Sequence, residues 1–236
     1  MKILAIDTTS GACSAALYDQ GAVCERFFRA ERDHTRRLLP MVDEVLAEAG
    51  IALSQVDALA VSRGPGSFTG LRIAISFAQG LAFASDKPVI PVSSLAALAA
   101  GAVREHEHWK NAPVLAALDA RMQEVYWGVY RSDVPHDSLL PEAVSSPEAV
   151  VEQLQAAGLV GSGAPLYAAG PGLHYPALGA LENVETVLAS DIQARDIAEL
   201  AAGLWARNEA VSADQLEPIY LRNEVTWKKR ERIRAR

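Results

Sequence analysis

The chain has 236 residues, of which 50% are hydrophobic and 22% are charged, and its formal net charge is −7 at pH 7. This composition excludes disordered and fibrous proteins, and the length allows one large domain or two lobes, because domains commonly have about 100–200 residues. The most apolar stretch, residues 71–84, is interrupted by polar side chains and is too short for a membrane span of roughly 20 residues, so we expect a cytoplasmic protein without a membrane contact or signal peptide.

The two cysteines are expected to be reduced thiols. Cys13 and Cys24 fall on strands that we predict to be adjacent, in a register that would place Cys13 opposite a residue near Phe27 rather than opposite Cys24. Neither cysteine belongs to a CxxC or Cys/His pattern, so the sequence gives no sign of a redox or metal site.

The first hundred residues predict a ribonuclease-H-like α/β lobe. Hydrophobic runs and turn residues predict three antiparallel strands, an amphipathic helix that begins at Leu38 and stops at Gly50, and then alternating strands and helices. Pro40 is expected in the first turns of its helix or at a kink, because it removes a backbone donor. The order β-β-β-α-β-α-β-α defines the lobe, with strands at 3–6, 13–18, 22–29, 56–61 and 89–92 and helices from 38, at 67–84 and at 94–103.

The helix at 67–84 is apolar almost all round, which predicts that neighbours bury it on more than one side. Small residues recur every four positions along it, at Gly70, Ala74, Ala78 and Ala82. Such a ridge lets another helix approach closely.

The second half repeats the beginning in outline. Ala116–Asp119 resembles Leu4–Asp7, and a tyrosine follows each aspartate by eleven residues, as expected of a duplicated two-lobe fold. We predict strands at 114–119, 123–130, 166–169 and 184–188, helices at 147–157 and 196–208, and a solvated loop at 104–112. The second lobe looks truncated, and the predicted boundaries are 1–103 for the first lobe, 104–215 for the second, and 216–236 for a segment that returns to the first lobe and ends in a basic tail.

Two loops after strands are candidates for binding nucleotide or another anion. The run Asp7-Thr8-Thr9-Ser10 resembles the first phosphate loop of actin-like ATPases, although such hydroxyl-rich turns also occur without ligands. The loop at 63–70 contains Gly64, Gly66 and Ser67 and lies between a strand and a helix, so its amides could hold an anion, or Ser67 could cap a tight turn. It is not a Walker A loop, and Gly170-Pro171-Gly172 is a poor match for a second-lobe partner.

No pattern in the sequence specifies a catalytic or metal-binding residue. None of the five histidines forms HxxxH or HExxH, no GxSxG elbow occurs, and no cysteine has an evident histidine partner.

Four motifs together resemble the bacterial TsaB family, also called YeaZ. They are MKILAIDTT at 1–9, HTRRLLP at 34–40, GPGSFTGLR at 64–72 and YLRNE at 220–224. The GPGSFTGLR run is the most specific, whereas residues 102–216 contain little that is diagnostic.

The resemblance implies an actin-like two-lobe fold with a reduced second lobe, in a protein needed to form threonylcarbamoyladenosine beside the anticodon of tRNAs that read codons beginning with adenine. TsaB-like proteins are thought not to catalyse the transfer. They bind a TsaD-like subunit, which holds the metal and the reactive intermediate, and a TsaE-like ATPase joins the pair. Their dimers, with TsaD or with themselves, are described as bundles of first-lobe helices, so a homodimer is expected when the chain is alone.

This resemblance predicts a partner interface on the first two helices and no resident cofactor or metal. It leaves open whether a nucleotide lodges at the subunit interface and whether Asp7 retains a ligand. The contacts are predicted to centre on nine residues, some of which must instead face the chain's own sheet, and the sequence does not divide them: Leu38, Leu39, Val42, Leu46, Gly70, Ala74, Phe77, Ala78 and Leu81.

Three alternative functions remain at this stage. The chain could be an actin-like ATPase that uses Asp7, Ser10 and the glycine loops, or a peptidase, although the second lobe and the missing nucleophile argue against these. It could also bind tRNA through Lys228, Lys229 and Arg230, because residues 225–236 have a net charge of +5. The remaining residues sum to −12, which argues against a free-standing RNA binder, and a solvated, frayed terminus is the favoured interpretation of the tail.

Overall fold

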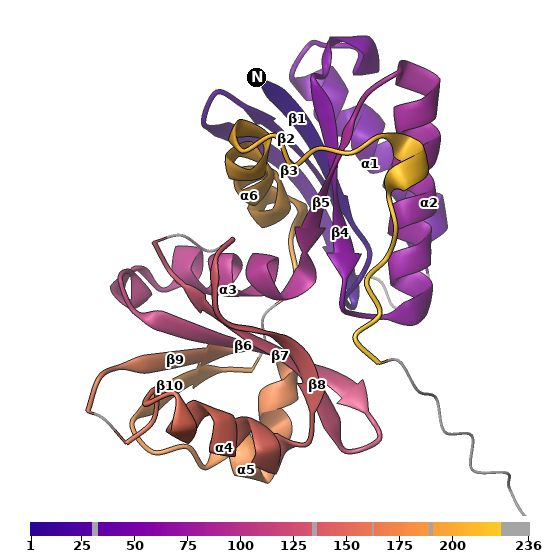
Figure 1. Cartoon of the computed structure of the whole chain (residues 1–236). Helices are drawn as coiled ribbons and strands as arrows, with labels where there is room; N and C mark the ends of the chain where they lie inside the picture. Colours follow the sequence, from indigo (N-terminus) through magenta and orange to yellow (C-terminus); the bar gives the residue numbers. More distant parts are fainter. Residues whose placement is uncertain (30–32, 134–135, 162, 189–190, 223–236) are drawn as a thin grey trace, which may run out of the picture.

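The computed structural model has two lobes, each built on a five-stranded sheet (Figure 1). It describes residues 1–29, 33–133, 136–161, 163–188 and 191–222. Within these ranges, no helix is both long enough and apolar enough to cross a membrane.

The first sheet has the strand order β3-β2-β1-β4-β5, in which β1 runs antiparallel to β2 and parallel to β4. Parallel neighbours need a crossover connection, and helices supply it here. The elements are β1 (Lys2–Asp7), β2 (Ala12–Asp19), β3 (Ala22–Arg29), α1 (His34–Glu48), β4 (Ala58–Gly64), α2 (Phe68–Ser85), β5 (Val89–Ser93) and α3 (Ser94–Glu105).

The second sheet has the order β10-β9-β6-β7-β8, which repeats the first sheet strand for strand. This equivalence confirms the duplication that the repeat at Asp7 and Asp119 predicted. The lobe is reduced because a four-residue helix, α5, takes the place of the 18-residue α2. Its elements are β6 (Pro113–Arg121), β7 (Glu124–Arg131), β8 (Ser138–Ser145), α4 (Pro147–Ala156), β9 (Leu166–Ala169), α5 (Pro176–Gly179), β10 (Val184–Val187) and α6 (Ala194–Ala206).

The last helix of each unit packs against the sheet of the other unit. Helix α3 contacts β6 and β7, whereas α6 covers β1 and β2 on the face opposite α1 and α2 (Figure 1). Polar groups of the first sheet hold the start of α6, because the Ala194 amide donates to Ser14 Oγ at 2.8 Å and the Arg195 amide to Glu25 Oε1 at 3.1 Å. These contacts cross the predicted boundaries, because α3 lies within 1–103 and packs on the second sheet, whereas α6 lies within 104–215 and covers the first.

Three further predictions need correction. Strand β8 was missed because Pro141 and its exposed residues obscure the alternation, as is common at a sheet edge. The segment expected as a solvated loop contains a 3₁₀ turn, Glu107–Trp109, in which Trp109 is fully buried and stacks on Tyr167 at 4.8 Å. Helix α1 begins at His34 rather than at Leu38. The cysteine prediction is confirmed, because Cys13 lies opposite Phe28, next to Phe27, and both cysteines are free.

The stop at the C-terminal end of α1 and the cap at the N-terminal end of α2 were predicted correctly. Gly50 has φ +66° and donates to the carbonyl of Ala47, so it ends α1 in a left-handed cap. Ser67 caps α2 by accepting a hydrogen bond from the Gly70 amide. Pro40 lies inside α1.

Candidate functional site at the cleft between the lobes

A cleft of about 1300 Å³ separates the two lobes at the carboxyl ends of β1 and β6. In actin-like and other open α/β folds, ligands bind beyond the carboxyl ends of such strands. Residues from both lobes and from the C-terminal segment line it: Thr9, Ser10, Gly11, Arg29, Gly66, Ser67, Phe68, Thr69, Arg72, Leu118, Asp119, Ala120, Arg121, Tyr126, Pro171, Leu188, Asp191, Ile192, Tyr220 and Arg222.

Asp7 does not line this cleft. Its carboxylate is fully buried and accepts hydrogen bonds from the Thr9 amide at 3.0 Å and the Thr9 hydroxyl at 2.7 Å. Burial raises the pKa of Asp7 to about 6, although the hydrogen bonds to Ser62 and Thr9 act in the opposite direction. The side chain thus closes its own turn, and Ser10 closes the next one by accepting from the Ala12 amide.

Thr8 joins the first loop to the start of α2. Its hydroxyl donates to the Gly70 carbonyl at 2.6 Å, and a Cβ at Gly70 would lie only 1.9 Å from the Thr8 carbonyl oxygen. Only glycine allows the helix to approach this closely. The two motifs recognised separately in the sequence are therefore one structural unit.

The remaining glycines of this loop serve similar contacts. The Ser67 amide donates to the Thr9 carbonyl at 3.0 Å, and a Cβ at Gly66 would lie 3.0 Å from that carbonyl oxygen. Gly64 has φ +102° and lies against the Ile219 carbonyl, next to the hydrogen bond from the Ile219 amide to Arg63. Of the seven predicted loop residues, Thr9, Ser10, Gly66 and Ser67 reach the cleft, whereas Asp7, Thr8 and Gly64 do not line it.

The second lobe contributes an equivalent loop and an unusual turn. Gly170 follows β9 as Gly64 ends β4, and a Cβ at Gly170 would lie 2.3 Å from the Ala117 carbonyl oxygen. Between β6 and β7, Arg121, Met122 and Gln123 have φ values of +62°, +57° and +64°. Consecutive non-glycine residues rarely adopt this left-handed backbone, and such turns are frequent at functional sites.

Asp119 supports that turn. Its carboxylate accepts from the Arg121 amide at 2.8 Å and from the Tyr175 hydroxyl at 3.1 Å, and it forms an ion pair with the Arg121 side chain at 2.9 Å. The guanidinium of Arg121 nevertheless remains exposed to solvent at the cleft.

The C-terminal segment crosses the mouth of the cleft. Arg72 lies over the Phe68 ring at 3.8 Å and donates to the Tyr220 hydroxyl at 3.3 Å. Arg222 then forms an ion pair with Glu124 of the second lobe. The segment that the sequence placed back on the first lobe therefore also ties the two lobes together.

Neither metal chemistry nor cysteine chemistry is favoured by these residues. Across the described ranges, no three His, Cys, Asp or Glu side chains gather as metal ligands do. Cys13 is buried, and that burial raises its pKa to about 11, so its thiol is protonated at neutral pH, unlike a nucleophilic cysteine.

The structure divides the nine predicted interface residues. Six of them, Leu38, Val42, Leu46, Gly70, Ala74 and Ala78, are buried within the chain itself. These six are therefore the part of the predicted set that faces the chain's own core, and on α2 the small residues let that helix settle on its own sheet. Leu39 is 45% exposed, and Phe77 and Leu81 are half-buried, so these three remain accessible.

Further apolar side chains of α2 extend the accessible face. Phe68 is 58% and Phe83 is 86% exposed. A shallow groove of about 450 Å³ runs between the start of α1 and α2, lined by Thr35, Phe68, Thr69, Arg72, Ile73, Ser76 and Phe77. Leu39 follows Thr35 by one helical turn and so lies on the same side of α1.

Sequence reasoning missed most of the charged and aromatic cleft residues. Arg29, Arg121 and Tyr126 come from three different strands or strand ends and share no motif. Their only signal was proximity to predicted strand ends. Lys228, Lys229 and Arg230, predicted as RNA contacts, lie outside the described residues.

Comparisons with known proteins identify the family. TsaB proteins described as "tRNA threonylcarbamoyladenosine biosynthesis protein TsaB" from Haemophilus influenzae and Escherichia coli are 44% and 43% identical to the chain, and each alignment covers 97% of the chain and at least 97% of the relative. The chain belongs to the TsaB family. The family described as "TsaD: tRNA N6-adenosine threonylcarbamoyltransferase" matches residues 16–217.

A solved TsaB-family structure has the same fold. The structure described as "YeaZ from Pseudomonas aeruginosa" is 44% identical, covers 93% of the chain and 99% of its own, and superimposes with a TM-score of 0.83. Membership of the TsaB family and the actin-like two-lobe fold, both predicted from the motifs, are confirmed.

Proposed function

We propose that the chain acts in the biosynthesis of threonylcarbamoyladenosine in tRNA as a non-catalytic scaffold. In this role it binds a TsaD-like catalytic subunit through α1 and α2, and a TsaE-like ATPase joins the pair. The observation that carries the proposal is the accessible apolar face of these two helices, in a chain whose relatives are named for this pathway.

The helical face suits a helical partner. Contiguous exposed apolar side chains mark interaction surfaces, and a groove between two helices accepts side chains of a third. Helices α1 and α2 lie on the side of the first sheet away from α6 (Figure 1), and Leu39, Phe77 and Leu81 are their accessible apolar residues among those predicted for the interface. A second copy of the chain could occupy the same face when no partner is present, which corresponds to the expected homodimer.

The state of the first loop supports a non-catalytic role. An ATPase of this fold needs a carboxylate available to metal and phosphate, whereas both oxygens of Asp7 accept hydrogen bonds from Thr9. A peptidase needs an activated nucleophile, whereas the thiol of Cys13 is buried and protonated. These observations disfavour the ATPase and peptidase alternatives.

A matched pair of leucines tests the interface. Leu39 on α1 and Leu139 on β8 are 45% and 44% exposed, so arginine at either site costs the fold little. We expect Leu39→Arg to weaken binding to a purified TsaD subunit at least tenfold, as measured by isothermal titration calorimetry. Leu139→Arg should bind like the wild type. Equal affinities for the two folded variants would contradict the proposed interface.

A further inference from the structure

The mouth of the cleft is positively charged in an acidic protein. Its lining contains four guanidinium groups, from Arg29, Arg72, Arg121 and Arg222, but only two carboxylates, from Asp119 and Asp191. The whole chain, in contrast, has a net charge of −7. Positive charge in a concave surface attracts polyanions because the low-dielectric walls concentrate the field.

These guanidinium groups have room to bind a ligand. Arg29 pairs with Asp191, Arg121 with Asp119 and Arg222 with Glu124, and the first two pairs are exposed on the arginine side, so they cost little to rearrange. Within the described residues, Arg72 contacts no carboxylate and instead lies against Phe68 and Tyr220. Arginine suits phosphodiester groups because its planar fork can donate two parallel hydrogen bonds.

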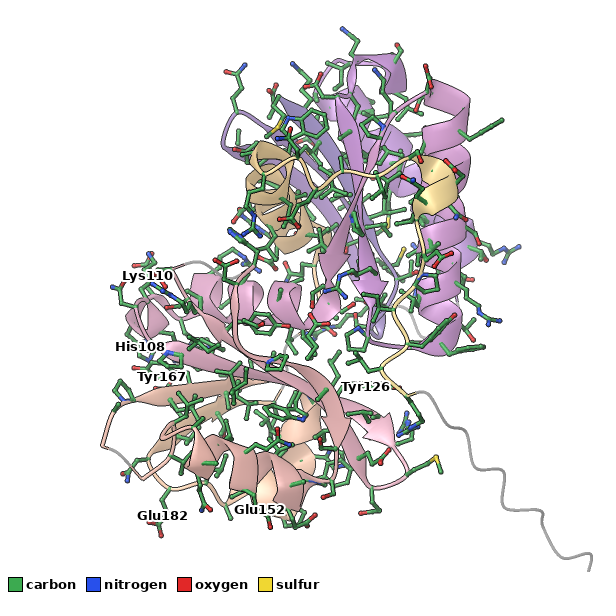
Figure 2. The ribbon with its side chains drawn as sticks, in the orientation of Figure 1. His108, Lys110, Tyr126, Glu152, Tyr167 and Glu182 are labelled. Carbon is green, nitrogen blue, oxygen red and sulfur yellow. The ribbon has the colours of Figure 1, made fainter. Side chains whose placement is uncertain are left out.

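The lining of the cleft includes aromatic rings as well as arginines. Phe68, Tyr126 and Tyr220 line the cleft, and the Phe68 and Tyr220 rings lie 6.0 Å apart. Tyr126 lies beside the end of the described C-terminal segment (Figure 2). Phe68 and Tyr220 are exposed and Tyr126 is half-buried. Aromatic rings close to arginines are typical of surfaces on which unpaired bases stack while the backbone is neutralised.

We propose that the cleft mouth, formed by Arg72, Arg121, Tyr126, Tyr220 and Arg222, binds single-stranded RNA. Arginines contact the phosphates and the aromatic rings stack on unpaired bases. A free nucleotide with its metal fits less well, because Asp7 is occupied by its own turn and Asp119 by the β6–β7 turn. The left-handed turn at Arg121 holds that side chain out over the cleft, where a flexible loop would not. This inference relies on the proposed function only for the choice of RNA as the polyanion.

RNA binding by the purified full chain tests the inference. The probe is a fluorescein-labelled single-stranded RNA of twelve nucleotides and mixed sequence, and the readout is fluorescence anisotropy at several NaCl concentrations. The test variants are Arg121→Gln and Tyr220→Ala. Glutamine suits the left-handed backbone of position 121, because Gln123 adopts the same conformation in this turn. The matched controls are Arg131→Gln, an exposed arginine of β7 paired with Asp133, and Phe83→Ala.

We expect Arg121→Gln to weaken binding at least threefold and to lower the slope of log K against log salt by about 0.7, the value for one phosphate contact on a single strand. Tyr220→Ala should weaken binding about fivefold or more, because base stacking is lost. Both control variants should bind like the wild type, and a twelve-base-pair duplex RNA should compete at least tenfold less well than unlabelled single-stranded RNA.

Three results would overturn the inference. The first is that the wild-type chain does not bind the probe. The second is that Arg121→Gln and Arg131→Gln lose the same amount of RNA affinity. The third is displacement of the RNA by MgATP at low concentration, which would indicate a nucleotide site. Leu39→Arg should bind RNA as the wild type does while losing affinity for the TsaD subunit. Failure of the cleft inference and failure of the proposed interface are therefore distinguishable.

Discussion

Replacing Gly70 by alanine is expected to destabilise the first lobe, although the same substitution stabilises most helices. The new Cβ would lie 1.9 Å from the Thr8 carbonyl oxygen and 3.0 Å from the Thr8 carbonyl carbon. Ordinary van der Waals contact begins at 3.4 Å, so α2 or the end of β1 would have to move by about 1.5 Å.

The size of the effect follows from three contributions. Overpacking a close backbone contact costs about 1–3 kcal/mol. The movement would also break the buried hydrogen bond from the Thr8 hydroxyl to Gly70, which contributes about 1 kcal/mol. The better helix propensity of alanine offsets about 1 kcal/mol. The expected net loss in the free energy of unfolding is therefore about 2 kcal/mol.

Gly80 in the same helix provides the control. No atom lies within 4 Å of the position its Cβ would take, and the residue is exposed. Gly80→Ala should therefore leave stability unchanged or raise it by up to about 1 kcal/mol. Both variants can be compared by urea unfolding followed by circular dichroism. If Gly70→Ala were as stable as Gly80→Ala, the close approach of α2 to the first loop would be refuted.

Three further variants or measurements test other parts of the structure. Burial raises the pKa of Asp7 to about 6 in the folded chain, so the contribution of this carboxyl group to stability is full below pH 3.8 and is lost as the pH rises through 6. The stability of Asp7→Asn relative to wild type should therefore rise by about 2–3 kcal/mol between pH 4 and 6.5. A stability difference that does not change with pH would contradict the raised pKa. Arg104→Ala leaves the buried carboxylate of Asp196 without the guanidinium that lies 2.8 Å away, and it should lower the free energy of unfolding in urea by about 3 kcal/mol. A loss below about 1 kcal/mol would show that this ion pair contributes little to stability. At pH 8 a thiol reagent should modify the half-buried Cys24 well before the buried Cys13, and mass spectrometry that found Cys13 modified first in the native chain would disprove its burial.

Local signals in the sequence predicted much of the fold. The cap at Ser67, the stop at Gly50 and the repeat of an aspartate after β1 and β6 depend on neighbouring residues only, so they could be recognised without a structure. The edge strand β8 could not, because its exposed side chains and Pro141 remove the alternation that marks a half-buried strand.

The predictions that failed depend on contacts between distant segments. The apolar pattern of α2 does not say which side faces its own sheet, so the sequence could not divide Ala74 and Ala78 from the interface residues, and the structure buries both. The periodicity of α6 likewise identifies a helix but not the sheet that it covers. That choice involves contacts with Ser14 and Glu25, which lie 180 and 170 residues before their partners in the sequence. The cleft arginines come from separate elements and become neighbours only when the lobes assemble.

Reconstituted threonylcarbamoylation of tRNA, with purified TsaD and TsaE subunits, tests the central claim of a non-catalytic scaffold most directly. The reaction is run with wild type, Leu39→Arg, Leu139→Arg and Asp7→Asn, after each variant is shown to be folded. The account predicts that Leu39→Arg loses activity and regains it at high subunit concentration, while Leu139→Arg and Asp7→Asn remain active. A folded Asp7→Asn variant without activity, together with ATP turnover by the isolated wild-type chain, would contradict the scaffold and indicate an enzyme.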